Sequence, residues 1–121
     1  MAKTDTGQDS FVAGEDLEAY RRVKPKAATP NTVQYADAGE DSIGVTSNRA
    51  SSGYAVSVDL WSKAGTFEIE ASEGITASAL CYGADDGKIK ATASGNACGW
   101  ARETASGSGS VIQVIPTGPE A

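Results

Sequence analysis

A unit of strand, polar loop and strand occurs twice in this chain, and this repetition limits the possible folds more than any other feature. The first copy spans residues 43–61 and the second spans 98–115. The second residue of each copy is a glycine, Gly44 or Gly99, that precedes an alanine by six positions. An extra residue in the second copy falls in its Gly/Ser loop, where an insertion costs little. Two hairpins in a Gly/Ser/Ala-rich chain can also look alike by chance. As a true repeat, the pattern predicts a β-domain built from similar hairpins.

Other segments also predict strands. Residues 54–61 alternate, with Val56 and Val58 on one face. A turn at 62–65 predicts a hairpin between this strand and 66–70, and Gly83–Gly87 predicts a second hairpin turn. About eight short strands separated by turns predict an all-β fold, a small β-sandwich or barrel of short antiparallel strands.

The predicted organisation has three parts. Residues 1–14 bury little and are expected to be a flexible N-terminal arm. Residues 15–116 form the β-rich domain, and 117–121 form a disordered C-terminal end. Whether 15–24 is a short helix or a first strand is left open, since Pro25 would end either element.

The apolar content points to self-association. Hydrophobic residues make up 40% of the 121, but 20 of them are alanine. Such a small core is marginal for a domain of this length, and oligomerisation is one way to bury more surface.

Charge limits the class of partner. The net charge is −6, and residues 1–26 are neutral overall, so the whole excess lies on 27–121. An acidic body repels nucleic-acid phosphates and anionic lipid, so neither nucleic acid nor a membrane is an expected partner. Residues 1–10 do not resemble a signal peptide, and synthesis in the cytoplasm is expected.

Catalytic chemistry is not expected. The chain has no histidine, which is the usual general base and the commonest metal ligand. Asp85 and Asp86 lie in a turn and supply too few oxygen ligands for calcium. Cys81 and Cys98 are expected to be small buried thiols rather than a disulfide, in no nucleophile motif. We therefore expect no enzyme activity, no metal and no cofactor.

The tryptophans allow two interpretations. Trp61 and Trp100 each lie at the end or start of a predicted strand, where they could cap the core. Alternatively, they lie in an interface between subunits, where tryptophan concentrates binding energy.

Several segments taken together resemble a known family. They are Ala38-Gly39-Glu40-Asp41, Ile43-Gly44-Val45, Ala50 through Gly53, Val56-Ser57-Val58, Cys81 through Ile89, Cys98-Gly99-Trp100-Ala101 and Val111 through Ile115. In order and spacing, residues 38–115 resemble the capsid cement proteins, or head decoration proteins, of tailed bacteriophages. Cys98 stands where isoleucine is usual, and the arm before Ala13 matches nothing diagnostic.

The resemblance implies a β-rich structural virion protein, often a homotrimer, on the outer surface of an icosahedral head. Its partner would be the major capsid protein, whose neighbouring subunits it would clamp, often with a terminal arm. The candidate capsid-binding residues on this hypothesis are Phe11, Val12, Leu17, Tyr20, Arg21 and Arg22, and the candidate subunit-interface residues are Trp61 and Trp100. The alternative is a tail or fibre accessory module that binds a host surface or glycan.

Overall fold

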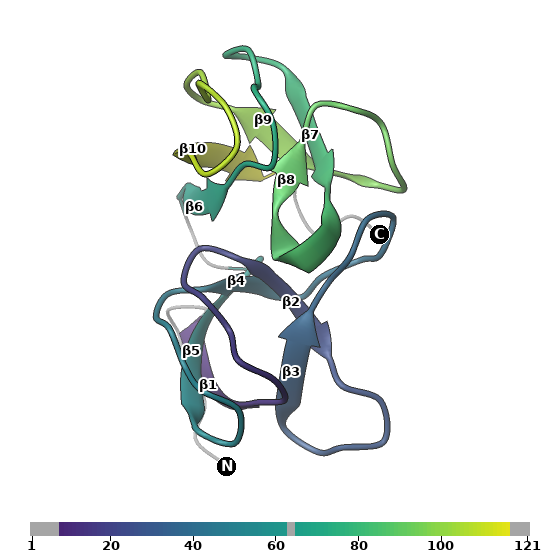
Figure 1. Cartoon of the computed structure of the whole chain (residues 1–121), viewed down its shortest axis with the longest axis vertical. Coiled ribbons are helices and arrows are strands. Elements are labelled where there is room, and N and C mark those ends of the chain that lie inside the picture. Colours follow the sequence, from purple (N-terminus) through teal and green to yellow (C-terminus); the bar gives the residue numbers. More distant parts are fainter. Residues whose placement is uncertain (1–7, 63–64, 117–121) are drawn as a thin grey trace.

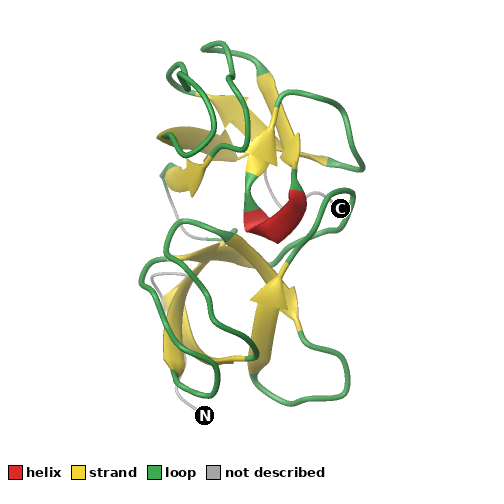
Figure 2. Cartoon of the chain, in the orientation of Figure 1, coloured by secondary structure: helices red, strands yellow, loops and turns green. Residues whose placement is uncertain are grey.

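The computed structural model describes residues 8–62 and 65–116, and this part of the chain is almost entirely strand and loop. The first half contains β1 (Gln8–Ala13), β2 (Arg22–Pro25), β3 (Thr32–Tyr35), β4 (Gly44–Thr46) and β5 (Ala55–Leu60). The second half contains β6 (Phe67–Glu70), β7 (Leu80–Gly83), β8 (Ile89–Lys90), β9 (Ala97–Ala101) and β10 (Val111–Pro116). A single 3-10 turn, η1 (Asp85–Gly87), joins β7 to β8. Figure 2 shows this turn in red where the two halves meet.

The first half is a closed barrel with the strand order β1-β3-β2-β4-β5 (Figure 1). Four of its five pairings are antiparallel, and the parallel pairing of β1 with β3 is the exception. Because β1 also pairs with β5, the sheet has no free edge.

The second half repeats this topology. Its sheet has the order β6-β10-β9-β7-β8, with antiparallel pairings throughout. A parallel bridge between Ala71 and Ile89 joins the ends of β6 and β8 and curls the sheet into a barrel-like shape. It corresponds to the parallel contact between Ala13 and Val33 in the first barrel. The all-β prediction is therefore confirmed, with two barrels stacked along the long axis (Figure 1).

The two barrels also agree in register. Gly44 lies opposite Leu60, and Gly99 lies opposite Pro116. Paired backbone hydrogen bonds join Leu17 to Ala50 in the first barrel, and the same two bonds join Ile75 to Ala105 in the second. The predicted repeat is confirmed, and it extends beyond the predicted hairpin to the whole barrel.

Equivalent positions supply both hydrophobic cores. The first core contains Ala13, Leu17, Val23, Val33, Ala50, Val56 and Val58. Their counterparts in the second core are Ala71, Ile75, Cys81, Ile89, Ala105, Ile112 and Val114. Burial at the same seven positions explains how two sequences with few identical residues form one fold twice.

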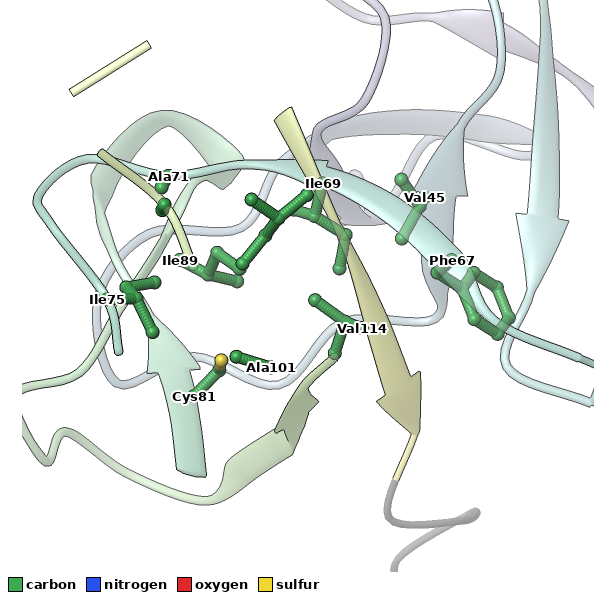
Figure 3. Packing of buried hydrophobic residues seen from close by; sticks show 11 residues of the cluster. Val45, Phe67, Ile69, Ala71, Ile75, Cys81, Ile89, Ala101 and Val114 are labelled. Carbon is green, nitrogen blue, oxygen red and sulfur yellow. The ribbon is translucent and has the colours of Figure 1, made fainter. Parts of the chain in front are cut away.

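The barrels share apolar contacts. Val45 projects outward from β4 and belongs to the core cluster of the second barrel, close to Phe67 and Ile69 (Figure 3). Trp61, just after β5, packs on Phe67 with ring centroids 4.7 Å apart.

The N-terminal arm prediction is wrong for the residues that the structure describes. Gln8–Ala13 form β1, an interior strand of the first barrel, and residues 1–7 lie outside the described part. The sequence of this segment predicts an arm because its apolar residues are few. The pairing of β1 with β5, which lies far along the sequence, compensates for this.

Two other expectations need correction. Residues 54–61 and 66–70 do not form a hairpin, since β5 pairs with β1 and β4 whereas β6 pairs with β10. The turn predicted between them is the connection from one barrel to the other. The predicted domain 15–116 therefore contains the boundary between two barrels. Within 15–24, the structure has an isolated bridge at Leu17 and then β2, with no helix in this segment. Residues 117–121 lie outside the described part.

Candidate interaction surfaces

Arg22 is the main polar link between the barrels. It lies on β2, on the outward side of the first barrel, yet only 1% of it is exposed. Its Nε donates to the carbonyl oxygen of Lys88 at 3.0 Å, and its Nη2 donates to those of Ala84 at 2.8 Å and Ala36 at 2.9 Å. A further bond from Nη1 reaches the carbonyl oxygen of Glu40 at 3.4 Å. One guanidinium thus satisfies four backbone acceptors from two barrels.

The surroundings of Arg22 explain how a buried cation is tolerated. Burial lowers the pKa of its guanidinium, while Cys98, Asp37 and Glu40 act in the opposite direction. Glu40 also accepts a hydrogen bond from Lys24 at 2.7 Å, and this bond is the largest cause of the lowered pKa of the Glu40 carboxyl.

A second polar link lies beside the first. Nε of Arg21 contacts Oε1 of Glu70 at 3.2 Å, and Nζ of Lys88 contacts the other oxygen at 3.6 Å. Arg21 also donates to the carbonyl oxygen of Asp86 at 3.0 Å and lies over the Tyr35 ring. Both arginines therefore hold the second barrel against the first.

The six candidate capsid-binding residues have different positions. Leu17 is buried in the first core and Arg22 between the barrels, so neither offers surface to a partner. Phe11 packs on the first core, and Arg21 is occupied by the second barrel. Only Val12 and Tyr20 are exposed, from β1 and from the loop before β2. The sequence predicts surface contacts for these arginines because they lie near a terminus. It does not show that the carbonyl oxygens that accept hydrogen bonds from Arg22 come from residues distant in the sequence.

The two tryptophans have different environments. Trp61 is partly buried against Phe67, and its Nε1 donates to the carbonyl oxygen of Ser42 at 2.9 Å. It helps to pack the junction, as the core-cap interpretation predicts. Trp100 points outward from β9 and is 48% exposed.

Trp100 belongs to an apolar outer face on the second barrel. Leu80 on β7 and Ile115 on β10 are its cross-strand partners, and Ile115 is 44% exposed. Val111 lies on the same side of β10, because strand residues alternate. Val111 and Ile115 alternate with the buried Ile112 and Val114, and this outward apolar pair is the signal in the sequence from which the face could have been predicted.

A groove of about 390 Å³ lies between the barrels. Its lining is mixed and includes Tyr20, Val45, Asp59, Phe67, Glu68 and Gln113. Tyr20 places one predicted partner-binding residue at its rim.

The residues considered for chemistry have structural roles. The Asp85 carboxylate accepts a hydrogen bond from the backbone N–H of Ala38, and the Asp37 carboxylate accepts one from that of Asp86. Cys81 and Cys98 are reduced thiols, and burial is the largest cause that raises the pKa of each. Among the described residues, no group of three or more Cys, Asp or Glu side chains is placed to bind a metal. In residues 8–62 and 65–116, no helix has the length and apolar content to cross a membrane.

Comparison with known proteins identifies a similar fold. No protein-family model and no curated protein matches the sequence. Among solved structures, the chain is similar to the N base of head fiber gp8.5 in bacteriophage phi29. The TM-score is 0.79 at 16% identity, and the match covers 94% of this chain and 98% of that one. The similarity shows a shared fold over both barrels.

Proposed function

We propose that this chain is a structural protein of a phage virion that binds the outer surface of the icosahedral head. The observation that carries the proposal is the fold match, which spans nearly all of this chain and of a head-fiber base. The resemblance of residues 38–115 to cement proteins supports the same location from independent features of the sequence.

The proposed mechanism is stabilisation by many modest contacts. A homotrimer that contacts several neighbouring copies of the major capsid protein binds through avidity. Because it binds the closed shell and not separated subunits, it raises the free energy needed to open the shell. Of the six candidate contact residues, Val12 and Tyr20 have the exposed surface for this role.

A second candidate is the base of a head fiber. It is favoured by one observation, that the similar solved structure is itself such a base. Both candidates bind the head, but a cement protein covers the lattice, whereas a fiber base carries an appendage.

Co-sedimentation with expanded heads that lack the protein tests both. Saturation at a copy number that fits the three-fold and quasi-three-fold positions supports a cement protein. Saturation at a smaller set of positions supports a fiber base. If the folded protein does not bind heads, both head-binding candidates are wrong, and the tail or fibre accessory module replaces them.

A further inference from the structure

The contact between the barrels has two halves, and each has a counterpart on the opposite barrel. The first half is the docking face, formed by Arg22 on β2 and Val45 on β4, which lie opposite each other in register. The second half is the docking turn, residues 83–88, which joins β7 to β8. Arg22 donates to two carbonyl oxygens of this turn, and the second barrel leaves Val45 only 2% exposed.

The counterpart of the docking face lies on the second barrel. Leu80 and Trp100 lie opposite each other in the same register as Arg22 and Val45. With Ile115, they form the apolar outer face described above, on which Trp100 and Ile115 are exposed and Leu80 is half-buried. Val45 and Trp100 thus occupy equivalent positions, but Val45 is buried and Trp100 is exposed.

The counterpart of the docking turn lies on the first barrel. Residues 25–31 join β2 to β3, and Pro25 and Lys26 correspond to Gly83 and Ala84 in register. Gly83 and Ala84 are buried, whereas residues 25–31 are all exposed. In the first barrel the face is therefore buried and the turn is exposed, whereas in the second barrel the turn is buried and the face is exposed.

The two open halves match each other in chemistry. In the contact inside the chain, a cationic face meets a turn with the sequence Gly-Ala-Asp-Asp-Gly, whose carbonyl groups accept its hydrogen bonds. In the open pair, Leu80 and Trp100 replace Arg22 and Val45 on the face, and the turn becomes Pro-Lys-Ala-Ala-Thr-Pro-Asn. The face loses its cation, Arg22, and the turn loses its two aspartates and gains two prolines and a second alanine beside Lys26, Thr29 and Asn31. Both surfaces have therefore become less charged together, as expected for surfaces that pack on each other. Proline also limits the conformations of the free turn, which lowers the entropy lost on docking.

We infer that the apolar outer face of the second barrel binds the 25–31 turn of a second copy of this chain. Within one chain, Trp100 and Ile115 on the face and residues 25–31 of the turn are all exposed, so the contact forms between copies. It is heterologous, and copies join head to tail. Such a contact closes into a ring when the rotation between copies allows it, and otherwise continues as a filament. The inference rests on the repeat and not on the proposed function.

Two variants of the full-length protein test the contact. Trp100→Glu places a charge on the face, and Ala27→Glu places one on the turn. Both sites are exposed, so the melting temperature should not change when circular dichroism is measured at a concentration low enough to keep the wild type monomeric. Sedimentation velocity of the wild type should show species larger than a dimer, and each variant should weaken self-association at least about tenfold. Ser108→Glu adds the same charge to an exposed loop and should associate as the wild type does.

Mixing the two variants gives the sharpest result. The turn of the Trp100→Glu copy and the face of the Ala27→Glu copy are both intact, so an equimolar mixture should form a heterodimer and nothing larger. If only Trp100→Glu lowers association, the face binds itself about a two-fold axis, and the inference is wrong. A wild type that is monomeric up to roughly 1 mM also overturns it. Ile115→Glu and Thr29→Glu provide a second pair should either first variant unfold.

Discussion

Gly44 and Gly99 lie at the same place in the two barrels, each against the backbone of the neighbouring strand. A Cβ atom on Gly44 would overlap the carbonyl oxygen of Asp59, and one on Gly99 would overlap that of Ile115. In each barrel, the two strands of this hairpin (β4 and β5, or β9 and β10) therefore lie closer together than a side chain at the glycine would allow.

Alanine at either glycine should destabilise the protein. We expect Gly44→Ala and Gly99→Ala each to cost about 1–3 kcal/mol, because the overlap is with backbone atoms that cannot rotate away. Urea denaturation measures the cost. Gly107→Ala is the control, since a Cβ there meets nothing within 4 Å. Equal stability of all three variants would contradict the close approach.

Replacing Arg22 should uncouple the barrels. Arg22→Met keeps much of the volume but leaves buried carbonyl oxygens without a donor, and we expect a loss of about 3–5 kcal/mol. Arg22→Lys should recover only part of it, because an ammonium group lacks the planar fork. Arg49→Ala is the control, because that side chain is 78% exposed. Hydrogen exchange should show the loss first at η1 and β8.

Cys81 should make the protein sensitive to alkali. Burial raises the pKa of its thiol from 9.0 to about 11, with a smaller contribution from Cys98. The folded state favours the neutral thiol, so this contribution is complete below pH 9 and is lost as the pH rises towards about 11. We expect a loss on the order of 2 kcal/mol over that range.

The control variant for this prediction comes from the repeat. Cys81→Val introduces the residue found at the equivalent position, Val23, and removes the titrating group. As the pH rises from 8 to 11, the unfolding free energy of the wild type should fall by more than that of the variant. A constant difference would show that the Cys81 thiol does not titrate in this range.

The position of β1 can be tested at Val12. Its backbone N–H donates to the carbonyl oxygen of Asn31 at 2.8 Å, and Val12→Pro removes this donor. We expect a cost of about 1–3 kcal/mol from the unsatisfied acceptor, with added strain from the ring. Val12→Thr retains the β-branched shape and the N–H, and it should be nearly neutral. Similar thermal stability of the two variants would restore the flexible-arm interpretation.

The sequence predicted the strand class and one hairpin repeat because alternating apolar residues and glycine turns are local patterns. It did not predict that the repeat covers the whole barrel. Tyr20 and Ser78, for example, both have a positive φ, and their backbone N–H groups donate to carbonyl oxygens at equivalent positions. The two residue types are not similar, so the sequence alone does not show that the positions are equivalent. The burial of Arg22 was also missed, because its acceptors at Ala84 and Lys88 lie in the other barrel. Trp100 was identified as an interface candidate, but only the comparison with Val45 indicates which surface it would meet.

Within residues 8–62 and 65–116, the placement of the first and last strands affects how the protein responds to mechanical load. β1 lies between β3 and β5, and β10 lies between β6 and β9, so neither strand is at an edge. A pulling force on either strand must break two ladders of hydrogen bonds together, whereas an edge strand can be peeled from one. Each barrel therefore resists unravelling from its outermost strand, a useful property for any protein that transmits tension between what is attached at its two ends.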